Sequence, residues 1–191
     1  MAQQTIDLHV NPSDETIQVG LLTVRFLLTA DDSSGSIAAF EVTVPGAQRL
    51  LAPAHSHDHY EETVYGIDGV LTWTVDGRQI KVGPGQALSI PRGAVHRFDN
   101  PGSQDVKALC VITPAALGPQ YFRECAEVID ATAGSAPDRA RLAEIMRRRL
   151  NARSTSGVAV GCTLALNAGV RSASCGNWRT QQRNAIPRTN L

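Results

Sequence analysis

Short stretches in which apolar and polar residues alternate dominate the first part of the chain, and turn-forming residues separate them. Leu71, Trp73 and Val75 alternate with threonines, a period of two that places them on one face of a strand. Asp76-Gly77 follows, a pair that is typical of a tight β-hairpin turn. Further strands are expected at 5–10, 17–19, 22–30, 36–44, 61–67, 78–82, 86–90, 95–98 and 106–113. Many short strands separated by turn residues predict an all-β sandwich or barrel.

The spacing of apolar residues becomes helical near residue 120. It predicts one helix over 120–131 and a second over 138–150, with a linker of small residues and a proline between them. Asp138 opens the second helix and three arginines, 147–149, close it, which suits the charge distribution of a helix dipole. We interpret these arginines as a solvated helix end rather than a nucleic-acid site.

Residues 151–191 follow neither period and are rich in Asn, Arg, Ser, Thr and Gly. No acidic residue follows Glu144, whereas eight arginines do. This composition predicts a basic tail that is disordered or loosely attached.

Length and charge narrow the class of protein. A chain of 191 residues is long enough for one well-buried domain. Its net charge of zero gives no reason to expect nucleic acid or a membrane as a partner. The four cysteines form no C-x-x-C pair, and the N-terminus lacks the charged and apolar regions of a secretory signal. We therefore expect a protein of the reducing cytoplasm.

Candidate metal ligands gather in 55–100. His55 and His57 are two residues apart, so on a strand both imidazoles point to the same side. Glu62 follows shortly afterwards, and His96 can join from another strand. Three imidazoles and one carboxylate suit a divalent Fe, Mn, Ni, Cu or Zn ion.

A second ligand set remains open on this reasoning. His59 shares strand parity with His57, and Glu61 is adjacent to Glu62, so His57, His59 and Glu61 could also converge. The motif spacing favours the first set, and it leaves His59 and Glu61 behind the ligands or at the pocket mouth.

The stretch 55–100 reads H-x-H-x4-E-x6-G followed by G-x5-P-x-G-x2-H-x3-N. These two ordered motifs resemble those of the cupin superfamily, and the short gap between them resembles small single-domain bacterial cupins. The resemblance implies a mainly β fold, a cupin barrel or jelly roll over 1–118, with two C-terminal helices over 119–150 packed outside it and the tail beyond. It also implies metal ligands at His55, His57, Glu62 and His96.

A metal held by four side chains keeps coordination positions free for substrate, which is typical of catalytic rather than structural sites. Similarity to quercetin dioxygenase-like cupins implies a metal-dependent oxidoreductase, a dioxygenase, that acts on a small organic molecule. Glu62 would be a ligand or a catalytic base. The expected pocket residues are His59, Tyr65, Trp73 and Phe98.

Two other functions remain open. One is a metal-dependent isomerase, lyase or epimerase that uses the ion only as a Lewis acid. The other is a cupin that binds a small ligand without catalysis. Small cupins are similar to one another in forming homodimers, and a strand at 5–10 is a candidate for exchange between two copies.

Overall fold

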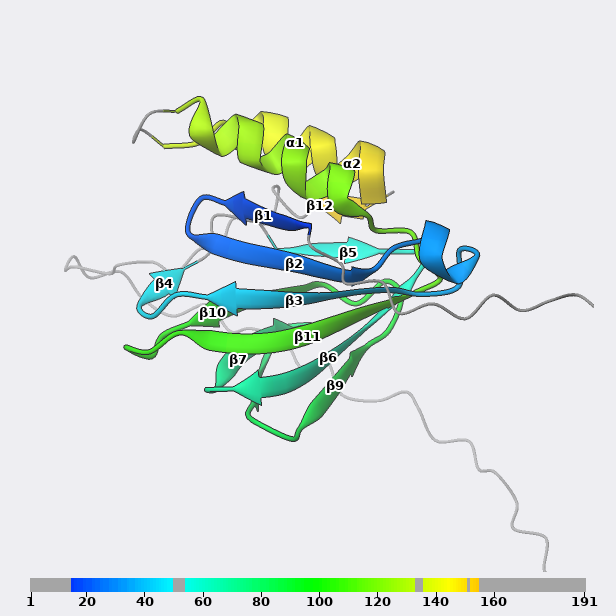
Figure 1. Ribbon diagram of the computed structural model, residues 1–191. Coiled ribbons are helices and arrows are strands. Elements are labelled where there is room, and N and C mark those ends of the chain that lie inside the picture. The colour runs from blue at the N-terminus through cyan, green and yellow to red at the C-terminus, as the bar shows by residue number, and fades with distance from the viewer. Residues whose placement is uncertain (1–14, 50–53, 133–135, 151, 155–191) are drawn as a thin grey trace, which may run out of the picture. The chain divides into compact units, whose positions relative to one another are not determined.

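The computed structural model describes residues 15–49, 54–132, 136–150 and 152–154. The expected strand at 5–10, the strand exchange that it would support and most of the expected tail lie outside the described residues. Within the described part, two antiparallel sheets face each other, and two helices follow them in the sequence (Figure 1).

Sheet A has six strands. Their order across the sheet is β1 (Thr16–Val19), β2 (Leu22–Leu28), β3 (Ala38–Val44), β11 (Val106–Thr113), β6 (Glu61–Asp68) and β9 (Ala87–Ile90). A short 3-10 helix (Asp31–Ser33) links β2 and β3. Strands β2 and β3 pair with each other in antiparallel register.

Sheet B is made of shorter strands. Their order is β12 (Ala152–Ser154), β5 (His55–His57), β10 (His96–Asn100), β7 (Leu71–Val75) and β8 (Arg78–Val82), and β4 (Gln48–Arg49) also pairs with β10. Asp76 and Gly77 have positive φ angles of 46° and 79°, the conformation that the β7–β8 hairpin turn requires. The sequence analysis did not predict β12.

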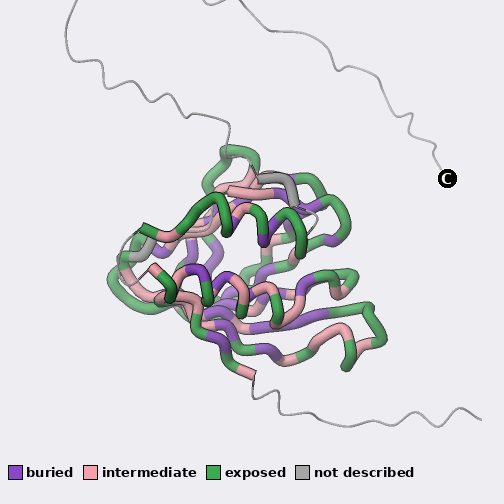
Figure 2. The backbone as a smooth tube through the Cα atoms, turned by 90° about the horizontal axis from the view of Figure 1, so that it is seen from above, coloured by how far each residue is buried: buried purple, intermediate pink, exposed green. Residues whose placement is uncertain are grey.

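The core lies between the two sheets, and buried residues recur along strands of both sheets (Figure 2). Leu71 and Trp73 on β7 are buried while the intervening Thr72 is not, as the alternation predicts. Inward residues of β11 follow the same rule. The fold class expected from the sequence, a mainly β jelly roll with two C-terminal helices, is confirmed.

Helices α1 (Pro119–Asp130) and α2 (Arg139–Leu150) lie side by side above β1 and β12 (Figure 1). Phe122 of α1 packs edge-on against Phe26 and Phe40 of sheet A, with ring centroids 5.7 and 5.3 Å apart. Asp138 caps α2, because its Oδ1 accepts hydrogen bonds from the backbone N–H groups of Ala140 and Arg141. No described helix is long and apolar enough to cross a membrane.

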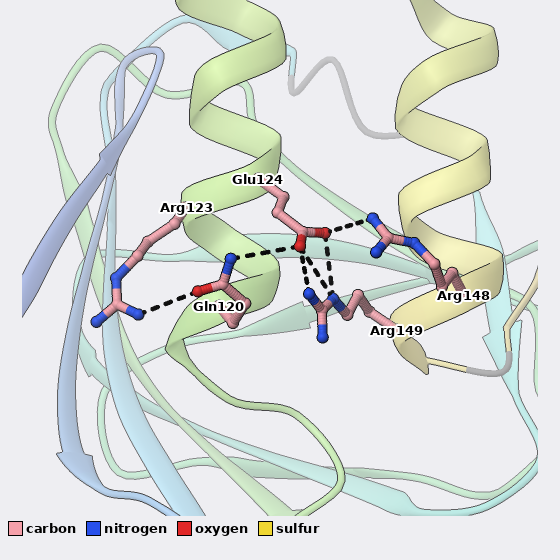
Figure 3. Close-up of polar contacts among 5 residues, drawn as sticks. All are labelled: Gln120, Arg123, Glu124, Arg148 and Arg149. Carbon is pink, nitrogen blue, oxygen red and sulfur yellow. Dashed lines mark hydrogen bonds and ion pairs between the residues drawn. The ribbon is translucent and has the colours of Figure 1, made fainter.

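The arginines at the end of α2 are exposed to solvent and also form ion pairs. Arg148 and Arg149 both donate to the carboxylate of Glu124 on α1, Arg148 Nη2 at 2.8 Å and Arg149 Nε at 3.2 Å (Figure 3). Gln120 and Arg123 continue this polar row along α1. The arginines are exposed at the helix end, as expected, and these two also join the helices to each other.

Candidate metal centre

Three of the expected ligands meet between the two sheets. His57 lies on β5 and His96 on β10, both in sheet B, and Glu62 faces them from β6 in sheet A. One ligand atom from each residue lies within 4.8 Å of the other two. The histidines are 0% and 2% exposed. This buried His–Glu–His group could hold a metal ion.

The turn between β9 and β10 helps to bring these strands together. Gly93 has a φ of 79°, which a residue with a side chain rarely adopts, and its N–H donates to the carbonyl of His57 at 2.9 Å. The motif glycine therefore ties the chain just before His96 to the strand that carries His57.

Both histidine rings are fixed by their Nδ1 atoms. His57 Nδ1 lies 2.9 Å from the carbonyl oxygen of Tyr60, and His96 Nδ1 lies 3.0 Å from that of Ala94. A carbonyl oxygen only accepts hydrogen bonds, so each Nδ1 must carry the proton. Each Nε2 then presents a lone pair unless its ring takes up a second proton.

These Nε2 atoms point at another acceptor. Glu62 Oε2 lies 3.5 Å from His57 Nε2 and 3.3 Å from His96 Nε2, and neither Nε2 has a hydrogen-bond partner of good geometry among the described residues. Buried acceptors that face one another are costly unless a cation lies between them. A metal ion fits this requirement, because ligating histidines typically donate their other N–H to a carbonyl.

The pKa values follow from the same contacts. Burial raises the pKa of Glu62, but the neighbouring imidazoles outweigh burial and bring the pKa down to about 2. For His96, burial lowers the pKa, and the carboxylate of Glu62 outweighs it and raises the pKa above 6.5. Glu62 is therefore an anion at neutral pH, the form in which a carboxylate binds a metal.

His55 lies beside this group rather than in it. It pairs with His96 across β5 and β10, and the centroids of the two rings are 4.5 Å apart. Its ring centroid is 6.2 Å from that of His57, and it is not among the three mutually close ligand atoms. It is also partly exposed.

The alternative ligand set is not brought together. Glu61 lies on the opposite face of β6 from Glu62, is exposed and faces Arg92 at 3.9 Å. His59 is exposed in the connection between β5 and β6, where strand parity no longer applies. Tyr65, expected in the pocket, is also on the outer face of β6 and is 44% exposed.

Aromatic residues line the interior next to the histidines. The ring of Trp73 lies 6.2 Å from His96 and 4.8 Å from Phe98, measured between centroids. Tyr60 stacks on His57 at 3.8 Å with an interplanar angle of 17°, and burial followed by the nearby Glu62 raises its pKa. Trp73 and Phe98 were expected near the site, and both lie in sheet B, the sheet that carries His57 and His96.

Cys110 was missed in the sequence analysis. It is buried on β11, and burial and then the carboxylate of Glu62 raise the pKa of its thiol well above its ordinary value. The thiol therefore stays protonated beside Glu62. The sequence did contain a signal for this position. Cys110 shares the period of two along 106–113 with Ala108 and Ile112, which are buried, so it is expected on the same inward face.

Comparisons with known proteins agree with the motifs. Residues 40–112 match the family model of the cupin domain. The chain is 27% identical over 99 residues to quercetin 2,3-dioxygenase of Bacillus subtilis, which covers 52% of this chain and 28% of that enzyme. It is also 27% identical over 115 residues to tetracenomycin polyketide synthase protein TcmJ of Streptomyces glaucescens, 60% of this chain and 76% of that protein.

Among solved structures, KdgF from Halomonas sp. is similar, with a TM-score of 0.47 and 14% identity, over 58% of this chain and 94% of that one. The ordered motifs, the facing antiparallel sheets and the matched family model lead to one conclusion: this chain contains a cupin domain over residues 40–112.

Proposed function

We propose that this cupin is a metal-dependent oxidoreductase, a dioxygenase that acts on a small aromatic hydroxy-ketone. The dioxygenase part of the proposal rests on the similarity to quercetin 2,3-dioxygenase, of which the matched region spans 28%.

One observation carries the metal-binding part. His57 Nε2, His96 Nε2 and Glu62 Oε2 are buried and converge, and the Nδ1 protons of both rings are already used by backbone carbonyls. We propose that these three residues hold one divalent transition metal and that His55, whose ring centroid lies 4.5 Å from that of His96, joins them as the fourth ligand when the ion binds. The bound ion would supply Lewis acidity and, if it is redox-active, reactivity toward oxygen.

The chain's own residues would have distinct parts in this reaction. A carboxyl group with a pKa of about 2 is a weak base, so Glu62 suits the role of ligand better than that of proton acceptor. The hydrogen bonds to Tyr60 and Ala94 would keep both rings from turning. Trp73 and Phe98 would exclude water from the side next to His96.

The substrate class follows from the surroundings and from the relatives. The residues around the group are aromatic and apolar, which favours a flat organic molecule over a phosphorylated sugar. One relative is named for quercetin and the other for a tetracenomycin polyketide synthase. We propose that the substrate is likewise a flavonol-like or polyketide-like molecule with adjacent oxygen groups.

Elemental analysis of protein purified without added metal or chelator tests the proposal. We expect about one redox-active ion per chain in the wild type and none in His96→Ala. His59→Ala, which changes an exposed histidine, is the matched control and should keep its metal. Oxygen uptake with flavonols and diketones then tests the dioxygenase.

Other outcomes point to the other two functions. Bound zinc with no oxygen uptake would replace the dioxygenase by an isomerase, lyase or epimerase that uses the ion as a Lewis acid. No metal in either protein would leave a cupin that binds a small ligand without catalysis. The expected homodimer stays a prediction, and light scattering of the purified chain tests it.

A further inference from the structure

We propose that α1, α2 and β12, which together we name the C-terminal brace, position the metal-binding strand β5. Metal affinity would then depend on residues far from the ligands in the sequence. This inference rests on the proposed metal centre and adds positioning residues to it.

Strand β5 is three residues long and receives much of its pairing from the brace. On one side it pairs with β10 through His55 and His96. On the other side β12 runs along its whole length, with Ala152 opposite His57, Arg153 opposite Ser56 and Ser154 opposite His55. The backbone that carries both histidines of the H-x-H motif is therefore held on one edge by the segment that follows α2.

Helix α2 is attached firmly enough to fix where β12 begins. Leu142 and Ile145 are buried against Cys125 and Val128 of α1. Met146 is 1% exposed and belongs to the main core. Because β12 starts shortly after α2 ends, this packing determines where β12 meets β5.

Charge adds to this attachment at the end nearest β12. Glu124 of α1 binds Arg148 and Arg149, the arginines in the last turn of α2 (Figure 3). The pKa of Glu124 is lowered to about 2, mainly by the hydrogen bond from the guanidinium of Arg149, so the carboxylate is charged at neutral pH. The ion pairs join the helices within a few residues of β12.

The ring that supports His57 belongs to the same hydrophobic core that the brace packs on. Tyr60 stacks on the His57 imidazole, and its carbonyl oxygen accepts the His57 Nδ1 proton. Tyr60 belongs to the same buried cluster as Phe122 of α1 and Met146 of α2. His57 is thus related to the brace both through its backbone and through the residue behind its ring.

Proline substitutions in β12 of the full chain test this inference. In an antiparallel ladder only every second residue of an edge strand directs its N–H toward the neighbouring strand. Of Arg153→Pro and Ser154→Pro, therefore, one removes a hydrogen bond to β5 and the other is its matched control. The probe is Co²⁺, with affinity measured by competition against a chelator and geometry followed by the visible spectrum.

We expect one proline variant to lose Co²⁺ affinity by roughly tenfold, the size typical of changes behind metal ligands. Hydrogen exchange at the backbone amides of β5 should accelerate in the same variant without metal. The Co²⁺ affinity of the other variant should stay within about twofold of that of the wild type.

The charge contact is tested separately. Glu124→Arg should weaken Co²⁺ binding by a few fold, and combining it with Arg148→Glu and Arg149→Glu should restore it, because opposite charges again face each other. Glu41→Gln is the control, since it breaks a similar exposed pair with Arg25 on sheet A, away from β5.

Two results would overturn the inference, and they differ from each other. If the wild-type chain binds no Co²⁺, the metal centre itself fails and the inference fails with it. If the wild type binds Co²⁺ and both proline variants bind it equally well, the metal centre stands and the brace does not position it.

Discussion

Glu62 and Glu124 have almost the same pKa, about 2, in very different surroundings. Glu62 is buried between two sheets and faces imidazoles whose Nδ1 protons are already in use. Glu124 lies on a helix surface and faces two guanidinium groups that always carry charge. Glu124 is thus neutralised by its own chain, whereas Glu62 needs a proton or a metal ion from outside. A low pKa therefore does not by itself identify a functional carboxylate.

The largest expected difference between the two glutamates is in metal binding. Glu62→Gln keeps the shape of the side chain and removes the anion, so we expect the affinity for Co²⁺ to fall by more than about 100-fold, beyond the range seen for residues behind metal ligands. Glu124→Gln should lower it by only a few fold. Chelator competition measures both, and equal losses would remove the distinction.

The next expected effect concerns folding stability and compares the packing of α2 with its ion pairs. Met146→Ala empties a buried position and should cost about 2–5 kcal/mol of unfolding free energy. Glu124→Gln should cost at most about 1 kcal/mol, because its ion pairs are exposed to solvent and screened. Urea unfolding of the metal-free protein measures both. A larger loss in Glu124→Gln would mean that charge rather than packing attaches α2.

The third difference is in the pH dependence of the metal-free protein. The raised pKa of His96 adds stability that is complete below 6.5 and is lost as the pH rises through that raised value. The lowered pKa of Glu62 adds stability that is present above 4.5 and is lost as the pH falls toward about 2. The contribution of the pair should therefore be greatest between pH 4.5 and 6.5.

Unfolding curves of wild type and Glu62→Gln at several pH values test this window. Their difference should peak inside it and should be smaller than the effect of Met146→Ala. A difference that does not vary with pH would mean that the carboxylate and His96 do not interact in the folded protein.

The smallest effect is expected on the outer face of sheet A. Tyr65→Thr changes an exposed residue on the side of β6 opposite Glu62, so metal affinity and any oxygen uptake should stay within about twofold of wild type. Trp73→Phe, on the interior face beside His96, should change the turnover of a bound flavonol. Comparable losses in the two variants would mean that the pocket opens on the outer face.

The sequence was informative wherever the determinant is local. Alternation and turn residues predicted the longer described strands but not the short β4, β5 and β12, and Asp76-Gly77 adopts the conformation that its hairpin needs. Motif spacing predicted that His57, Glu62 and His96 would meet. Tyr65 was misplaced although the signal was present, because residues three apart on a strand point to opposite faces.

Contacts between distant segments could not be predicted in this way. Strand β12 is three residues long and contains no β-branched residue, so only its position beside β5 makes it a strand. The pairing of Glu124 with Arg148 and Arg149 depends on how two helices dock, which the spacing within each helix does not specify. The alternative ligand set that included His59 depended on strand parity, which ends where β5 ends.

The proposed ligands come from both sheets, because the histidines lie in sheet B and the glutamate lies in sheet A. A bound ion would therefore cross-link the two sheets, and its binding free energy would add to the free energy needed to separate them. Removal of the ion by a chelator should let the two sheets move independently. A force applied between β5 and β6 should then separate the sheets at a lower value in the metal-free protein than in the metal-bound protein.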